Sequence, residues 1–200
     1  MTGFDISGLP HLPRPRQGVN PLVDRILLVE DRAARELMLN ILRKRDHKTL
    51  IRSELISLGG HGEITRACQA FPTRTSAFQL VAVYDGDVRT EVNGLRPTWP
   101  HAFLPGTEAI EVTFREILER DVGRIATRLG RTENEMSIIL GRLRGLDHHD
   151  WFEDLARGLH VSYSELMHVC YEQWIEEEWV QAHVDNFLFD LGNAVDASRN

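Results

Sequence analysis

Acidic residues follow three apolar segments of the chain, close to the point where each segment ends. They are Glu30, after residues 25–29; Asp85 and Asp87, after residues 78–84; and Glu108 and Glu111, shortly after residues 101–104. If the segments are neighbouring parallel strands, their carboxyl ends meet at one edge of the sheet. Carboxylates crowded there repel one another, and they are the ligands that Mg²⁺ and Mn²⁺ prefer. The pattern predicts a divalent-metal site, although Asp85-Gly86-Asp87 taken alone is also a common turn.

The segments that would position these acids alternate between strand and helix. Expected strands are residues 25–30, a stretch within 49–58, residues 78–84 and residues 101–104. Leu37, Met38, Ile41 and Leu42 recur at helical spacing after the first strand, and a short helix is expected from Glu63 to about Ala70. Asn93, Gly94, Pro97 and Pro100 favour a loop before the fourth strand. This alternation predicts an α/β fold, a parallel sheet of about four strands with helices on both faces.

The chain after the fourth strand is expected to be helical almost to its end. Breaks are expected near Gly130, residues 145–150, residues 158–162 and Gly192. Ser162 followed by Glu165 forms a capping box for one of these helices. We therefore divide the chain into a proline-containing extended arm at 1–22, a metal-binding domain at 23–120 and an all-helical C-terminal subdomain at 121–200.

Length and composition favour a globular protein. The chain has 200 residues, 42% of them hydrophobic, which is enough for a core in one large domain or two small ones. Its longest apolar runs are far shorter than a membrane helix requires, and its first residues lack the pattern of a secretion signal. We therefore expect no membrane association and a cytoplasmic location. Cys68 and Cys170 are expected to be reduced and buried.

The net charge of −7 is unevenly distributed. Residues 1–145 hold 21 Lys and Arg against 18 Asp and Glu, whereas residues 146–200 hold 2 against 12. The acidity is therefore concentrated in the C-terminal quarter. The rest of the chain remains able to approach a phosphate backbone, so the charge is compatible with DNA as a partner without arguing for it.

At its acidic motifs the sequence resembles the Toprim domain, the metal-binding fold of topoisomerases, bacterial primases and nucleases of the overcoming-lysogenization-defect (OLD) family. Toprim chains have a glutamate at the end of the first strand and Asp-x-Asp at the end of the third, as Glu30 and Asp85-Gly86-Asp87 do here. The segments 26–34 and 103–106, the latter followed by Glu111, are similar to the OLD branch. The resemblance covers residues 24–120 well and 146–180, with His149-Asp150-Trp151-Phe152, more loosely.

The resemblance implies a Rossmann-like Toprim sheet and a metal-dependent endonuclease that hydrolyses DNA phosphodiester bonds. Glu30, Asp85, Asp87 and Glu111 would hold two Mg²⁺ or Mn²⁺ ions, with Glu108 as the second choice for the helix position. The resemblance also implies an ABC-type ATPase partner in a phage-defence or DNA-processing system. The chain contains no G-x-x-x-x-G-K-[ST] motif, so the ATPase would be a separate domain or subunit.

The sequence departs from the family in its basic residues. OLD nucleases use a lysine after the Toprim core, but here no lysine follows Lys48. Candidates to stabilise the transition state in its place are Arg142, Arg144, His148 and His149. We favour His149 as the additional catalytic residue.

Two other functions stay open from the sequence. Residues 26–31 could also open a response-regulator receiver module, in which Asp85 would accept a phosphoryl group. Asp85 lies 55 residues beyond Glu30, which is far for a receiver, and that interpretation leaves Asp87 unexplained. The third interpretation is a catalytically silent Toprim subunit that serves in assembly; self-association of the chain also stays open.

Several conspicuous residues have plainer explanations. The arginines between 115 and 131 alternate with acids, which favours a solvated face over a DNA-binding ridge. The aromatic residues after position 150 are expected to pack in the core or a subunit interface, and Glu176-Glu177-Glu178 to face solvent. Gly59-Gly60-His61-Gly62 is expected to be a turn, with nucleic-acid contact as the lesser alternative.

Overall fold

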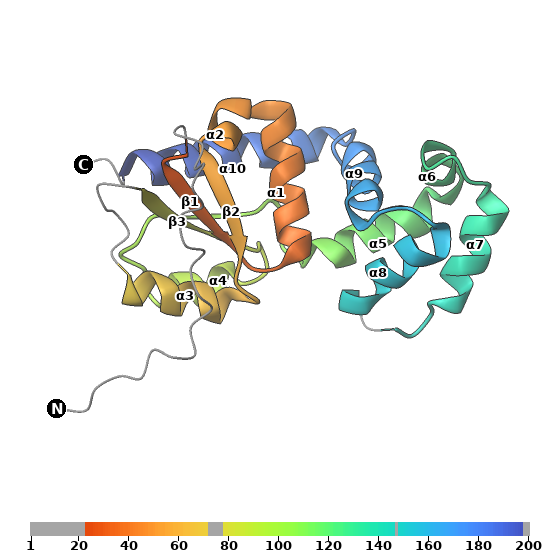
Figure 1. Ribbon diagram of the computed structural model, residues 1–200, viewed down its shortest axis with the longest axis horizontal. Helices are drawn as coiled ribbons and strands as arrows, with labels where there is room; N and C mark the ends of the chain where they lie inside the picture. Colours follow the sequence, from red (N-terminus) through yellow and green to blue (C-terminus); the bar gives the residue numbers. More distant parts are fainter. Residues whose placement is uncertain (1–22, 72–77, 147, 198–200) are drawn as a thin grey trace, which may run out of the picture.

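A computed structural model describes residues 23–71, 78–146 and 148–197, in which four strands form one sheet (Figure 1). The strands are β1 (Arg25–Val29), β2 (Ser53–Ser57), β3 (Gln79–Tyr84) and β4 (His101–Phe103). All neighbours pair in parallel, in the order β2-β1-β3-β4. The predicted α/β fold with a four-stranded parallel sheet is confirmed.

Helices connect the strands and form most of the remaining chain. In the described residues they are α1 (Arg32–Arg45), α2 (His47–Ile51), α3 (His61–Ala70), α4 (Arg89–Gly94), α5 (Ile110–Arg120), α6 (Val122–Arg128), α7 (Glu133–Arg142), α8 (His148–Leu159), α9 (Tyr163–Trp174) and α10 (Glu178–Ala197). Local signals explain several boundaries: the side chain of Asp31 caps α1 by accepting from the N–H of Ala34, and Ser162 caps α9 by accepting from that of Glu165.

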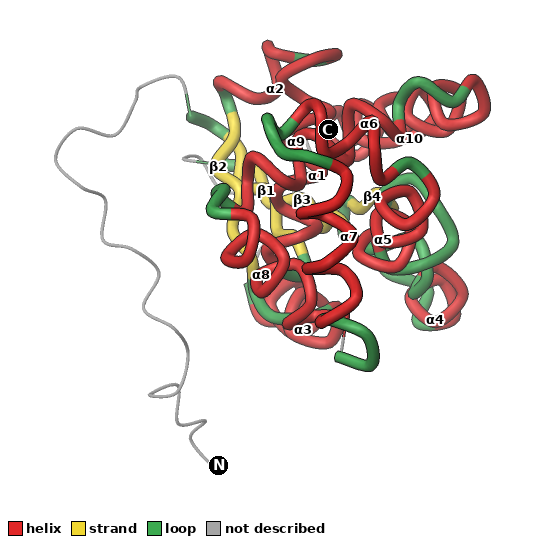
Figure 2. Tube along the Cα trace, turned by 90° about the vertical axis from the view of Figure 1, so that its right-hand side faces the viewer, coloured by secondary structure: helices red, strands yellow, loops and turns green. Residues whose placement is uncertain are grey.

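Both faces of the sheet are buried, because alternate residues of the central strands enter two separate cores. Leu27 of β1 and Val81 of β3 belong to the larger core, with α1, α5, α8 and α9. Leu28 and Leu80 belong to the smaller core, with α3 and α4. Figures 1 and 2 show α3 and α4 together on one side of the strands. The prediction of helices on both faces is therefore confirmed, and it explains why β1 and β3 are continuous apolar runs.

Two expectations about local structure were wrong, and one short helix was not expected. Residues 89–94 form helix α4 where we expected only a loop, because Val92 is buried in the smaller core. The unexpected helix is α2, at residues 47–51; β2 follows it and lies within the segment 49–58, as expected. Helix α10 continues through Gly192 without a break, since burial of residues such as Phe187 and Leu191 outweighs the low helix propensity of one glycine.

The C-terminal helices pack into the same core as the sheet. The larger core includes Leu118 of α5, Leu155 of α8, Leu166 of α9 and Val184 of α10. Helix α10 packs against the edge strand β4, and α9 packs against α1. The larger core therefore crosses the expected boundary at residue 120, while the arm expected at residues 1–22 lies outside the described residues.

Candidate metal centre at the carboxyl edge of the sheet

The strand order places the carboxyl ends of β1 and β3 side by side at a topological switch point. The chain passes from β1 outward to β2 in one direction and from β3 outward to β4 in the other. In open α/β sheets, the crevice at such a point is where ligands bind. Glu30 directly follows β1 and Asp85 directly follows β3, so both acids stand at this position.

A direct hydrogen bond joins these two strand ends. The carboxylate Oε1 of Glu30 accepts from the backbone N–H of Asp85 at 2.9 Å, and both residues are buried. The backbone carbonyl of Glu30 accepts from the N–H groups of Gly59 and Gly60 at 2.6 and 3.0 Å. The loop after β2 is therefore held at the same edge, and Glu30 is turned toward Asp85 as the metal-site prediction requires.

A close backbone approach fixes the loop that carries Asp85 and Asp87. A Cβ added to Gly86 would lie 2.1 Å from the carbonyl oxygen of Gly106, so only glycine fits at position 86. Gly106 itself has φ +112°, a backbone conformation that residues other than glycine rarely adopt. The Asp85-Gly86-Asp87 loop and the loop of residues 104–106 therefore interlock through their two glycines. Asp87, next to this contact, is exposed.

Of the two glutamates after β4, the structure places Glu111 in the acidic cluster. Glu111 lies in the first turn of α5, is 4% exposed, and contributes its charge to the environment of Asp85. Glu108 precedes the helix, is exposed, and lines a separate cavity with Trp179 and His183. Glu111, the first choice for the helix position, is therefore buried and acts on Asp85, whereas Glu108, the second choice, faces another part of the surface.

Burial and mutual repulsion make Asp85 hard to ionise. Loss of solvation raises its pKa to about 8, and the charges of four neighbouring acids contribute in the same direction. These acids are Glu30, Asp31, Asp87 and Glu111. Desolvation also raises the pKa of Glu30, against hydrogen bonds from the backbone of Asp85 and His61. Repulsion among the acids of this edge therefore adds to the effect of burial on the pKa of Asp85.

The carboxylate oxygens at this edge are donors of the type that hard divalent cations prefer. The Oδ1 atom of Asp85 is buried and finds no hydrogen-bond partner among the described residues, so an acceptor is left over at the centre of the cluster. Across the described side chains, no three Asp, Glu, His or Cys residues are yet close enough to hold one ion. One oxygen of Glu30 and one of Asp31 are engaged by backbone N–H groups, so side-chain rotation would have to bring further ligands to Asp85.

Sequence reasoning missed two side chains at this edge as parts of the site. His61, the first residue of α3, places its Nδ1 atom 3.9 Å from Oε2 of Glu30. Its Nε2 atom lies 3.1 Å from Oε1 of Glu91, which belongs to α4. The glycines before His61 are the local signal, since they let the chain turn sharply from β2 into α3. The proximity to Glu30 depends on the strand order and has no local signal.

Helix α9 supplies a further wall of the site. Tyr163 is nearly buried, and burial raises the pKa of its hydroxyl group, as do the charges of Glu111 and Asp31. The guanidinium of Arg32 lies over its ring, 4.1 Å from the centroid, and donates to Glu153 of α8 at 2.8 Å. The helices after residue 120 therefore border the acidic edge, which the sequence did not indicate.

The residues proposed to replace the family lysine are not brought to the site by any described contact. The side chain of His149, our favoured candidate, lies outside the described residues, as does that of His148. Arg142 is the last residue of α7 and Arg144 follows it; both are exposed. The role of His149 stays a prediction.

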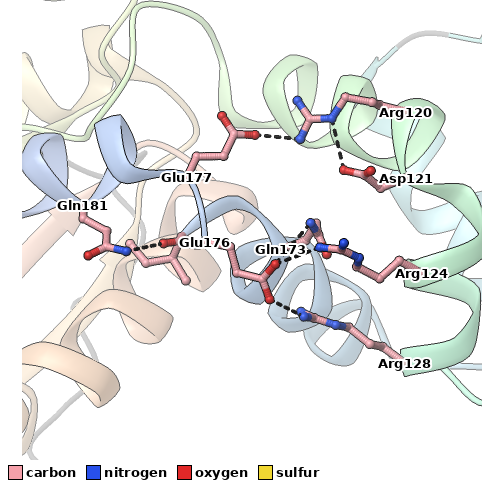
Figure 3. Close-up of polar contacts among 9 residues, drawn as sticks. Arg120, Asp121, Arg124, Arg128, Gln173, Glu176, Glu177 and Gln181 are labelled. Carbon is pink, nitrogen blue, oxygen red and sulfur yellow. Dashed lines mark hydrogen bonds and ion pairs between the residues drawn. The ribbon is translucent and has the colours of Figure 1, made fainter.

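The arginines of α5 and α6 form ion pairs with the acidic segment after α9 (Figure 3). Arg120 donates to Glu177, while Arg124 and Arg128 both donate to Glu176. Their pairing argues against a free basic ridge for DNA, in line with the solvated face that we expected. It also corrects the expectation for Glu176 and Glu177, which bridge helices instead of only facing solvent.

The expectation for the late aromatic residues and the cysteines is largely confirmed. Those buried in the core are Trp151, Phe152, Trp174 and Phe187. Trp179 and Phe189 on α10 are instead 50% and 70% exposed. Cys68 and Cys170 are buried free thiols, and burial raises the pKa of Cys68 to about 12.

No helix among the described residues is both long enough and apolar enough to cross a membrane. No model of a known protein family, no curated protein and no solved structure matches the chain. The Toprim and OLD resemblance therefore stays a prediction.

Proposed function

We propose that this protein is a Mg²⁺- or Mn²⁺-dependent endonuclease that hydrolyses DNA phosphodiester bonds at the carboxyl edge of its sheet. The observation that carries this proposal is buried Asp85, whose Oδ1 atom has no partner among the described residues and whose ionisation is opposed by the charges of Glu30 and Glu111 from two other chain segments. Clusters of like charge at a switch point are most simply explained by a cation that neutralises them.

In this proposal each acid has a defined part. Glu30, Asp85, Asp87 and Glu111 would hold two divalent ions, and such ions would supply an activated water and stabilisation of the leaving oxygen. The hydrogen bond from the Asp85 N–H keeps Glu30 oriented toward the site. Asp87 is exposed, so it would add a solvent-accessible carboxylate to the buried ligands. The carboxylates position ions and perform little proton transfer themselves.

The biological setting in the proposal comes from the family resemblance. It comprises an ABC-type ATPase, supplied by another domain or subunit, and a role in phage defence or DNA processing. The uneven charge of the chain is compatible with DNA, because the acidic surplus is concentrated after residue 145, away from the first three strands and their loops in the sequence.

A receiver-like phospho-acceptor is the second candidate, because one observation favours it. The order β2-β1-β3-β4 corresponds to the first four strands of the flavodoxin-like order that receivers share. Against it, Asp85 is only 7% exposed and its pKa is raised to about 8, so little of the ionised carboxylate that would attack an external phosphodonor is present at neutral pH. A silent Toprim subunit would share the metal site and lack only the cleavage.

Cleavage of supercoiled plasmid separates these functions. We expect Mg²⁺ or Mn²⁺ to support nicking by the wild type, and Asp85→Ala to abolish it, because the central ligand is lost. Asp154→Ala is the matched control, since Asp154 lies on α8 and pairs with Arg157 on the surface. Phosphorylation of Asp85 by acetyl phosphate would support the receiver. Metal binding without cleavage, also in the presence of an ATPase partner, would support the silent subunit.

A further inference from the structure

His61 is held at the acidic edge by the backbone around it. Gly59 and Gly60, with φ +90° and +134°, turn the chain so that their N–H groups donate to the carbonyl of Glu30. The next residue, His61, begins α3 and is 33% exposed at its side chain. It therefore borders the site and remains accessible to a ligand.

The imidazole of His61 presents a donor to an anionic acceptor. Its Nε2 atom lies 3.1 Å from the Glu91 carboxylate, and an ionised carboxylate only accepts, so Nε2 carries a hydrogen. The Glu91 side chain is 65% exposed. Exposed pairs of this kind contribute little free energy, so another anion can take the place of Glu91.

The arginines closest in sequence to the two acidic motifs are turned to other groups. Arg32 donates to Glu153 and lies over the Tyr163 ring. Arg89 lies over the ring of Phe103, 4.7 Å from its centroid. His61, in contrast, lies beside Glu30 itself. Its ring therefore stands next to one of the proposed metal ligands.

From this geometry we propose that His61 is a catalytic residue whose Nε2–H donates to a non-bridging oxygen of the scissile phosphate. That oxygen replaces Oε1 of Glu91 on His61. The proposal rests on the proposed function, because it assigns the substrate contact of the same site. His61 would then be the group beside the carboxylates that binds the phosphoryl oxygen. The chain has no lysine after position 48 to do so.

The chemistry requires no proton transfer from His61. Water adds its oxygen to phosphorus, and the ester P–O bond breaks with its electron pair remaining on the leaving oxygen. A proton of that water ends on the alcohol product. Negative charge accumulates on the non-bridging oxygens in the transition state, and a fixed N–H donor stabilises it there. Loss of one such donor typically lowers kcat about 10²- to 10³-fold in a buried site, and less where solvent has access.

Four variants test this assignment in the plasmid and oligonucleotide cleavage assays. We expect His61→Ala to lower kcat about 10- to 100-fold because the transition-state donor is lost at a partly exposed site. His61→Gln should recover part of the rate, because its amide also carries an N–H donor. Glu91→Ala should lower KM a few-fold, because a competing anion is removed. His47→Ala is the control, since His47 is an exposed histidine of α2, before β2.

Binding measurements distinguish a substrate contact from a structural role. Mn²⁺ affinity, measured by titration calorimetry, should change less than about twofold in His61→Ala, because the imidazole does not hold the ion. Affinity for a DNA duplex in Ca²⁺, which permits binding without cleavage, should fall about three- to tenfold through loss of a charge-assisted hydrogen bond. An unchanged kcat and unchanged duplex affinity in His61→Ala would overturn the assignment.

The two proposals fail in different ways. If the wild type does not cut with either metal, the proposed nuclease is wrong, and duplex binding in Ca²⁺ still decides whether His61 contacts phosphate. If the wild type cuts and His61→Ala cuts equally well, only the role of His61 is wrong. A Glu91→Ala variant as slow as His61→Ala would show that Glu91 orients the ring throughout, which contradicts the exchange of Glu91 for phosphate.

Discussion

Asp85 is the residue on which the site depends most. Its carboxyl group is 7% exposed, its Oδ1 atom lacks a described partner, and burial with four neighbouring acids raises its pKa to about 8. A buried carboxylate in this state destabilises the fold near neutral pH unless a cation compensates it. The free energy of unfolding of the metal-free protein should therefore report directly on this group.

We expect Asp85→Asn to stabilise the metal-free protein at pH 7.5 by about 1–3 kcal/mol relative to the wild type, with little difference at pH 4. The pKa of Asp85 is raised in the folded state, so the folded protein retains a proton that the unfolded chain releases. The contribution of Asp85 to the free energy of unfolding of the wild type is therefore present at low pH. It is lost as pH rises from about 4 to about 8.

Urea denaturation of both proteins in chelator at several pH values measures this difference. Subtracting the two curves removes the contributions of groups that titrate alike in both proteins. A difference that stays constant between pH 4 and pH 8 would contradict the raised pKa of Asp85.

At the residue scale, Glu30, Asp85 and Asp87 were predictable because Glu30 and Asp85 directly follow buried strands and Asp87 lies in the same turn as Asp85. From the sequence, only the family resemblance favoured Glu111 over Glu108 as a metal ligand. The structure supplies the physical reason: α5 begins at Ile110, so Glu111 enters its first turn and is buried with the helix. His61 and Glu91 were not predictable as neighbours, since they lie 30 residues apart on different helices.

At the element scale, two loops at the carboxyl edge are locked together. The backbone of Gly86, after β3, approaches that of Gly106, after β4, too closely for any side chain. This contact sets the distance between the segment that carries Asp85 and the segment that leads to Glu111. The two loops therefore act as one support for the acidic cluster.

Gly86→Ala should lower the free energy of unfolding by about 1–3 kcal/mol, because the added Cβ would force the two loop backbones apart. It should also abolish the rise in melting temperature that we expect Mg²⁺ to give the wild type, because the proposed ligands separate. Both effects are measured by calorimetry with and without Mg²⁺.

Gly141→Ala is the matched control for this substitution. Gly141 lies in α7 with open space around it, so alanine there should be neutral or stabilise by about 0.5–1 kcal/mol through its higher helix propensity. A Gly86→Ala protein that unfolds like the wild type and keeps its response to Mg²⁺ would contradict the interlock.

The sequence predicted the strands better than the short helices. The buried strands β1 and β3 are continuous apolar runs, a pattern that few other structures produce. Helix α4 has only six residues, and Asn93 and Gly94, which we interpreted as loop signals, lie at its C-terminal end. Its existence depends on the burial of Val92 against β3 and α3, a tertiary contact.

At the scale of the whole molecule, one hydrophobic core connects the sheet with the C-terminal helices. Phe114 of α5 packs edge-on against Trp174 of α9, with ring centroids 5.9 Å apart. Helix α10 returns to the sheet and packs against β4. Ion pairs from Arg120, Arg124 and Arg128 to the segment after α9 bridge the same helices (Figure 3). The expected division at residue 120 thus separates parts that share a core.

A fragment of residues 23–120 should therefore fail to fold cooperatively. Removal of the helices after residue 120 would expose Phe114, Ile117 and Leu118 of α5, which are buried in the full chain. Near-ultraviolet circular dichroism and urea denaturation of the fragment, beside the full-length chain as control, measure this outcome. A sharp, cooperative transition in the fragment would instead establish residues 23–120 as an independent domain.

The sequence by itself determined the alternation of strands and helices, the parallel sheet, and the acids at the strand ends. These features can be identified locally. A strand that is buried on both faces is a continuous apolar run in the sequence, and an acid that follows a parallel strand lies at the carboxyl edge of the sheet whatever the strand order. Only the tertiary structure decided that Glu30 binds the backbone of Asp85, that His61 and Glu91 join the edge, and that α9 borders it. Those contacts link segments distant in the chain, and they follow from strand order and helix packing, which no local pattern of residues specifies.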